Sequence, residues 1–210
     1  MTERISPQQA WDQLIEGNGR FVSNTPRHPN QDLERRNLLE HGQRPTAVLF
    51  GCGDSRVASE IIFDQGLGDL FVVRTAGHII DDAVLGSIEF GVELLDVPLI
   101  VILGHQSCGA IAAGIAAAES GEMPPGYVRD IAVQVMPSVA RAHAAGDASP
   151  AAVGALHVRA TADLLFERSR ICHDAVERGD LAIVGATYAL HDGKASALTA
   201  TPAVRTGGTD

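Results

Sequence analysis

Two short apolar runs, each followed by residues that bind metals, constrain the fold of this chain most strongly. The first, residues 48–50, leads into Gly51-Cys52-Gly53, and the second, residues 98–103, leads into Gly104 and His105, with Cys108 close behind. A buried parallel strand delivers side chains to its carboxyl end, where open α/β sheets keep their ligands. The sequence therefore predicts one site built from two strand ends.

Cys52, His105 and Cys108 together offer two thiolates and one imidazole, a ligand set typical of zinc. Three protein ligands rather than four leave one coordination position for water, as in catalytic zinc sites. The step from His105 to Cys108 lets both side chains turn toward one point where a strand passes into a helix, whose positive start favours a thiolate. The alternative is that the cysteines are small core residues and the histidine a structural group. We interpret the three residues as zinc ligands.

The spacing of these residues resembles that of a known family. Cys52, Asp54 and Arg56 form a Cys-x-Asp-x-Arg motif, and His105 with Cys108 forms His-x-x-Cys. With both motifs in this order, the chain resembles the β-class carbonic anhydrases of the plant-like, open-site type, from about residue 6 to residue 193. The resemblance implies a lyase, a carbonate dehydratase that holds Zn²⁺ and converts carbon dioxide reversibly to bicarbonate and a proton by zinc-hydroxide attack. It also implies a homodimer or homotetramer with its sites near the dimer interface.

Asp54 and Arg56 are interpreted as catalytic, although their spacing alone favours an ordinary ion pair in a solvated loop. A free carboxylate beside a zinc ligand is able to take the open coordination position. A guanidinium that holds the carboxylate by two parallel hydrogen bonds prevents this. We therefore expect Arg56 to keep the site open and Asp54 to accept a hydrogen bond from zinc-bound hydroxide. At lower pH, or in Arg56→Ala, the carboxylate is expected to move onto the metal.

The resemblance adds five candidate substrate-binding residues. The side-chain amide of Gln43 and the backbone amide of Gly109 are expected to donate to the substrate oxygen that becomes negative. Phe71, Ala76 and Phe90 match positions of an apolar pocket wall that is shared partly across the dimer interface. Without the resemblance, Gln43 is an exposed residue before a turn, and core packing explains the three apolar residues equally well.

Other functions stay open at this point. Hydrolysis of carbon disulfide or carbonyl sulfide is possible at the same zinc site, and only access to the site separates these reactions. The sequence has no obvious insertion that narrows the entrance, which favours carbon dioxide. A non-catalytic zinc-binding regulatory protein of the same fold would not need Asp54, Arg56 and Gln43. A redox role is weaker still, because Cys52 and Cys108 are not a Cys-x-x-Cys pair.

Charge and cysteine content limit the partners and the compartment. The formal net charge of -10 argues against nucleic acid or an anionic membrane surface as a partner. Three cysteines, two of them claimed as metal ligands, do not make a disulfide framework. The first residues lack the apolar core of a signal peptide, and no stretch is long enough to span a membrane. We therefore expect a cytoplasmic protein.

Strand patterns that alternate with helix patterns predict an α/β fold, with a mainly parallel β-sheet flanked by helices and an N-terminal helical arm. We expect a single domain over residues 1–210, with the arm at about 6–42, the core at about 46–192 and a poorly ordered tail at 193–210. The apolar face of the first helix, around Trp11, is expected to pack on the partner subunit, with its own domain as the alternative. Helices are expected at 7–22, 33–41 and 58–63, from 81 or 82, from 109, and at 128–144 and 151–178; strands are expected near 48–50, 70–73, 98–104 and 181–184.

We expect no effector site for bicarbonate. Some bacterial relatives bind bicarbonate at a non-catalytic site made by a tryptophan, an arginine and a tyrosine. Arg74 and Tyr188 match two of those positions, but Leu49 occupies the third and offers no N–H to a buried anion. Arg74 and Tyr188 are then structural residues, and Arg74 is expected to pair with a carboxylate at the subunit interface.

Overall fold

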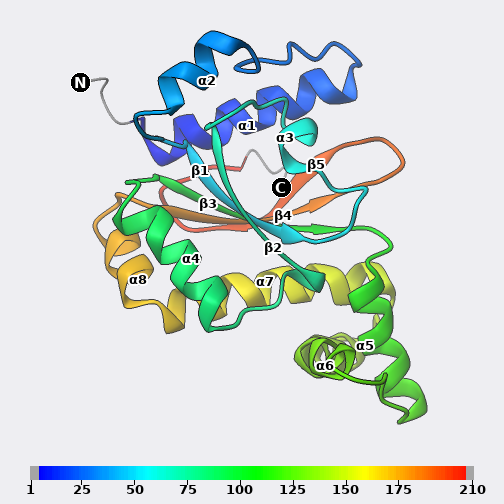
Figure 1. Cartoon of the computed structure of the whole chain (residues 1–210). Coiled ribbons are helices and arrows are strands. Elements are labelled where there is room, and N and C mark those ends of the chain that lie inside the picture. Colours follow the sequence, from blue (N-terminus) through cyan, green and yellow to red (C-terminus); the bar gives the residue numbers. More distant parts are fainter. Residues whose placement is uncertain (1–4, 207–210) are drawn as a thin grey trace.

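A five-stranded sheet in the order β2-β1-β3-β4-β5 forms the centre of the molecule in the computed structural model, which describes residues 5–206. The first four strands are parallel, and β5 runs antiparallel to β4. Helices cover both faces of the sheet (Figure 1), which confirms the predicted α/β fold. The strands are β1 Ala47–Cys52, β2 Leu70–Thr75, β3 Leu99–His105, β4 Ala182–Tyr188 and β5 Ala195–Ala200.

Strands β1 and β3, which lie next to each other inside the sheet, have continuous apolar sequences because both of their faces are covered. Every residue of β1 and β3 is buried. Alternate side chains point to opposite faces, so Phe50 and Ile102 join one core cluster, whereas Leu49 and Leu103 join the other. This burial on two sides fixes the strand ends that carry Cys52 and His105.

Eight α-helices surround the sheet within residues 5–206, and most of them begin and end near their predicted bounds. One expected helix is divided: Ser169 leaves helical geometry and caps the next helix with its hydroxyl, which accepts from the backbone N–H of Cys172. No helix in this range is both long enough and apolar enough to cross a membrane. The helices are α1 Pro7–Val22, α2 Leu33–Leu39, α3 Ser59–Ile62, α4 Asp82–Glu93, α5 Gly109–Ser120, α6 Val128–Ala144, α7 Pro150–Arg168 and α8 Arg170–Glu177.

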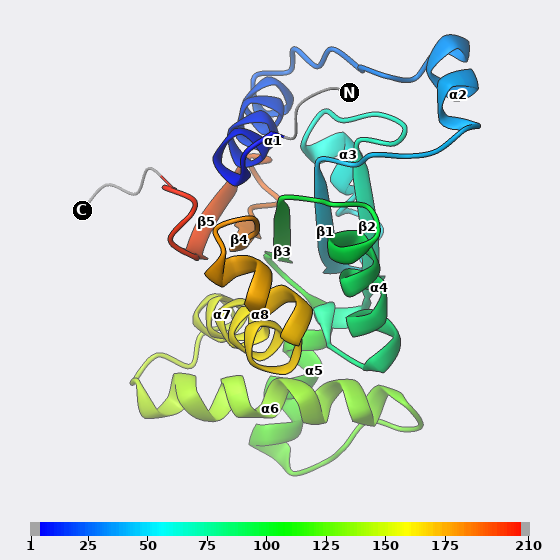
Figure 2. The same cartoon turned by 90° about the vertical axis from the view of Figure 1, so that its left-hand side faces the viewer.

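Helix α1 lies on one face of the sheet, and α4, α7 and α8 lie on the other, with α5 and α6 extending beyond them (Figure 2). The expectation that the apolar face of α1 packs on a partner subunit is wrong for this structure. Trp11 and Leu14 are buried against their own chain, in the cluster that contains Leu49 and Leu103. The helix covers its own sheet because that face otherwise has no apolar cover.

The expectation of a poorly ordered tail is also wrong over residues 195–200, which form β5, while residues 207–210 lie outside the described residues. Asp192 and Gly193 lie in the loop of residues 189–194 between β4 and β5, and Gly193 has a positive φ of 76°. Asp-Gly is a strong hairpin signal. The small alanines and threonines of the strand obscured the signal, because they carry little of the β-branched apolar pattern of an inner strand.

The side chain of Asn18, on α1, ties three separate segments together. Its Nδ2 donates to the carbonyl oxygens of Ile62 (3.1 Å) and Gly193 (2.8 Å), and its Oδ1 accepts from the N–H of Ala195 (2.9 Å). Only 4% of Asn18 is exposed. The hydrogen-bonding groups of this amide are therefore satisfied by backbone groups, and it holds α1 to α3 and to the start of β5.

We predict that Asn18→Ala lowers the free energy of unfolding by roughly 1–3 kcal/mol, because it leaves buried backbone groups unpaired. The loss should be local at first, so hydrogen exchange at β5 should accelerate more than at β1. Asn37→Ala is the matched control, since Asn37 is exposed on α2. Unchanged exchange at β5 in a variant of normal stability would contradict this role of Asn18.

Candidate metal centre

Two neighbouring parallel strands and one helix start bring together Cys52, His105 and Cys108. Strand β1 ends at Cys52 and β3 ends at His105, and the strands pair in parallel up to Gly51 and Leu103. Cys108 is the N-cap of α5. The potential ligand atoms of the three residues all lie within 4.8 Å of one another, and the two sulfurs are 3.9 Å apart.

His105 is held in the tautomer that a metal ligand requires. Its Nδ1 lies 2.9 Å from the backbone oxygen of Gln106, which only accepts, so Nδ1 carries the proton. Its Nε2 is buried and has no hydrogen-bond partner. A buried nitrogen with a free lone pair and no partner is unusual. The ring is therefore oriented from behind, as in metal sites, with its lone pair directed toward the sulfurs.

The two cysteines behave as one acidic pair. A hydrogen bond from the Cys108 thiol is the main cause that lowers the pKa of Cys52 to about 4, against the opposing effect of burial. The same pairing is the main cause that raises the pKa of Cys108, so the two sulfurs hold one proton between them. Burial alone would lower the pKa of His105, but the electrostatic attraction of the nearby Cys52 sulfur outweighs burial and raises it.

The donor set fits zinc. Thiolate sulfurs and neutral imidazole nitrogens are typical zinc ligands, and the site offers two sulfurs and one such nitrogen. Three protein ligands leave the fourth coordination position of zinc open. A cation between the sulfurs would replace the shared proton and give His105 Nε2 the partner that it lacks.

Asp54 and Arg56 form the pair with two side-chain hydrogen bonds that was expected beside a zinc ligand. Arg56 donates from Nε to Oδ1 (3.0 Å) and from Nη2 to Oδ2 (2.8 Å), and its backbone N–H also reaches Oδ1 (2.9 Å). The hydrogen bonds from the Arg56 side chain lower the pKa of Asp54 well below its usual range. Oδ2 of Asp54 is 4.0 Å from Nε2 of His105. The carboxylate is thus fixed and ionised at the edge of the donor cluster.

Arg74 is a further site residue, which the sequence placed at a subunit interface instead. Its guanidinium donates to the backbone oxygens of Cys52 (2.9 Å) and Asp54 (2.7 Å), so within this chain it binds carbonyl groups and holds the loop between them. The feature that could have identified Arg74 as a site residue is its position in β2, directly opposite Gly51 of β1. Tyr188 and Leu49 are both buried in the core cluster under α1.

The candidate substrate-binding residues divide into two groups. Gly109 begins α5, where a backbone N–H has no partner within the helix, and Ala76 follows β2 next to the Cys52 loop. Phe71 and Phe90 instead stack on each other, with 5.9 Å between ring centroids, along the edge strand β2 and α4. These two residues are not brought to the donor cluster of their own chain.

Gln43 is also not brought to this cluster within its own chain. It is exposed and precedes β1, whereas Cys52 ends β1. A strand of this length, six residues, separates its two ends by roughly 17–20 Å. Because the chain runs one way through the strand, Gln43 lies at the opposite edge of the sheet from Cys52.

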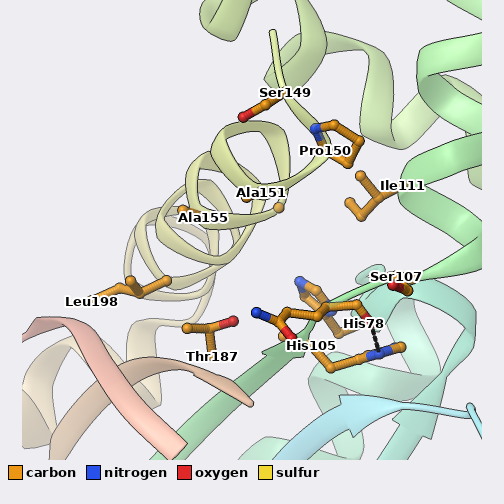
Figure 3. A pocket seen from close by; sticks show the side chains of 14 residues that line it. His78, His105, Ser107, Ile111, Ser149, Pro150, Ala151, Ala155, Thr187 and Leu198 are labelled. Carbon is orange, nitrogen blue, oxygen red and sulfur yellow. Dashed lines mark hydrogen bonds between the residues drawn. The ribbon is translucent and has the colours of Figure 1, made fainter. Parts of the chain in front are cut away.

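A pocket of about 560 Å³ opens beside His105 and Cys108, and the start of α7 forms its far wall. Figure 3 shows His78 and His105 at one end of the pocket and Ser149 and Pro150 across from them. Sequence reasoning missed this wall, because nothing in the pattern of α7 relates it to the strand ends.

His78 is buried, both of its ring nitrogens lack partners, and burial lowers its pKa well below the usual value, so it is neutral.

Comparisons with known proteins agree on one family. The model of the family described as carbonic anhydrase matches residues 47–195. Carbonic anhydrase 2 of Mycobacterium tuberculosis is 55% identical over 190 residues, which cover 90% of this chain and 92% of the relative. The carbonic anhydrase of Mycolicibacterium smegmatis is 55% identical over 189 residues, with the same shares covered. Among solved structures, the β-carbonic anhydrase CcaA is similar with a TM-score of 0.70 and 25% identity, over 89% of this chain and 94% of that one.

We predict that the purified protein binds one zinc ion per chain and that Cys108→Ser loses most of it, since a serine hydroxyl is a far weaker zinc ligand than a thiolate. Cys172→Ala is the matched control. Cys172 is fully buried on α8 in another core cluster, and burial raises its pKa to about 11, so its loss should leave the metal content unchanged. Elemental analysis of all three proteins measures this. Full metal content in Cys108→Ser would exclude Cys108 as a ligand.

Proposed function

The chain belongs to the β-carbonic anhydrase family, and on that premise we propose that it catalyses the reversible, zinc-dependent hydration of carbon dioxide to bicarbonate and a proton. One observation carries the proposal. Cys52, His105 and Cys108 direct two sulfurs and an unpartnered imidazole nitrogen to one point, beside the fixed carboxylate of Asp54. A bound zinc ion lowers the pKa of its water to about 7, which supplies the nucleophile at neutral pH.

The chain's own residues have separate tasks in this proposal. Asp54 is ionised, so it accepts a hydrogen bond and orients the attacking oxygen. Arg56 keeps that carboxylate from turning inward, and it also donates to the backbone oxygen of Ser107 (3.1 Å), which joins the two ligand loops. The exposed N–H at the start of α5, from Gly109, is suited to the oxygen of the substrate that gains charge.

We further propose that the working unit contains at least two chains. Strand β2 lies at the edge of the sheet, and beside it Phe90 (44%) and Leu94 (66%) are exposed. An edge strand with apolar neighbours needs a cover, and isologous pairing with a second copy supplies it. Gln43 and Phe71 lie away from the donor cluster of their own chain. If they contact substrate, they therefore do so at the metal centre of another chain.

We predict that Arg56→Ala lowers kcat for carbon dioxide hydration by roughly ten- to a hundredfold, because Asp54 loses the charged hydrogen bonds that fix it. The pKa of Asp54 should rise toward its usual value, since Arg56 is the main cause of its lowering. Zinc content should stay at the wild-type level. Arg170→Ala is the matched control, because Arg170 pairs with Asp174 on the exposed surface of α8 (2.8 Å). Hydration rates by stopped flow measure this, and a wild-type rate in Arg56→Ala would contradict the assignment.

We predict that Phe90→Asp shifts the protein toward monomers in analytical ultracentrifugation, because it places a charge in the proposed contact. Val133→Asp is the matched control, since Val133 is exposed to a similar extent (46%, against 44% for Phe90) but lies on α6. Activity per chain should fall with the loss of the dimer. A monomeric wild-type protein with full activity would rule out the second chain.

A further inference from the structure

Gly77 lies between the Cys52 sulfur and a buried histidine. Its N–H donates to Sγ of Cys52 at 3.3 Å, and its carbonyl oxygen lies 3.1 Å from Nε2 of His157, on α7. On its other side, Nδ1 of His157 lies 3.3 Å from Oγ of Ser138, on α6. Three segments far apart in the sequence therefore form one chain of hydrogen bonds that ends on a candidate metal ligand.

The direction of these hydrogen bonds follows from elementary chemistry. The carbonyl oxygen of Gly77 only accepts, so Nε2 of His157 carries the proton. Burial lowers the pKa of His157, and the hydrogen bond to Gly77 opposes this only in part, so the ring is neutral. Its Nδ1 must then accept, and the hydroxyl of Ser138 donates to it. His157 (5% exposed) and Ser138 (2% exposed) are both buried, so water does not compete for these bonds.

The backbone at Gly77 needs this support. Gly77 and the next residue, His78, both have positive φ angles, 68° and 44°. Two successive residues in the left-handed region are uncommon, and the second carries a side chain. A Cβ atom at Gly77 would come within 2.5 Å of Cβ of Ala110, at the start of α5, so the turn is also packed closely against the helix that follows Cys108. A small change in this turn would move the N–H away from the sulfur.

We propose that His157 is a positioning residue for the metal centre, which acts through Gly77 to keep an N–H group on the Cys52 sulfur. The inference rests on the proposed metal site. The hydrogen bond withdraws electron density from the thiolate and fixes its orientation, so His157 tunes a ligand that it does not touch. Ser138 supports it by fixing the tautomer of the ring.

The test uses the whole protein with Co²⁺ in place of zinc, because the sulfur-to-cobalt charge-transfer absorption reports the electron density on the thiolates. In His157→Leu, which keeps the bulk but has no donor, the band should move to longer wavelength. Zinc binding, measured by competition with a chelator, should weaken by about tenfold. His157→Gln presents an amide N–H near the position of Nε2, so it should restore both values. His157→Asn places its amide near Nδ1 instead and should not restore them.

His173→Leu is the control for loss of a histidine, since His173 on α8 packs on Phe166 on α7 and contacts none of the candidate ligands. A folded His157→Leu protein with the wild-type band and zinc affinity would overturn the inference and leave the proposed function standing. If His157→Leu does not fold, the comparison of His157→Gln with His157→Asn decides, and identical bands in both would overturn it equally. A wild-type protein that binds neither metal would overturn the metal site and this inference together.

Discussion

The parallel pairing of β1 with β3 is the constraint on which the rest of the structure depends. Adjacent parallel strands end at the same edge of a sheet, so the pairing places Cys52 and His105 beside each other although they are 53 positions apart in the sequence. Close packing on both faces of both strands fixes this register, because a slip by one residue would exchange the side chains that fill the two core clusters. The geometry of the metal centre is thus set by the hydrophobic core before any ligand is bound.

Around that edge, negative charge is matched by donors from several segments. The sulfurs of Cys52 and Cys108 face backbone N–H groups of the turn at Gly77 and of the start of α5. Arg56 neutralises the carboxylate of Asp54, and Arg74 holds the backbone on which both Cys52 and Asp54 sit. Because these donors are fixed by the fold, the site needs little rearrangement to stabilise anionic groups. The same arrangement explains why β2 matters to the site although none of its side chains is a candidate metal ligand.

How far the sequence predicted this arrangement depends on how local each signal is. The grouping of the three candidate ligands was predictable, because strand ends are visible as apolar runs that stop at glycine and polar residues. Helix starts at Ser6 and Asp81 were equally visible, since a cap is a property of a few neighbouring residues. The distance of Gln43 from the ligands of its own chain was not predictable, because a motif gives the separation along the sequence but not the end of the sheet at which a residue lies. Arg74 and His157 were not found as site residues because their partners are backbone atoms of distant segments, which leave no pattern of residue types.

The bridge made by Asn18 also bears on when the protein can reach its native state during synthesis. Its partner Ala195 is 177 residues further along the chain, and the exposed contact between Gln8 and Arg205 spans 197 residues. A nascent chain emerges from the ribosome with its N-terminal part first. Helix α1 can therefore form all of its native contacts only after β5 has been synthesised. Until that moment the apolar face of α1 and the β4 edge of the sheet are incompletely covered. The interval between the synthesis of the core strands and that of the last strand is therefore the period in which this chain most needs protection from aggregation.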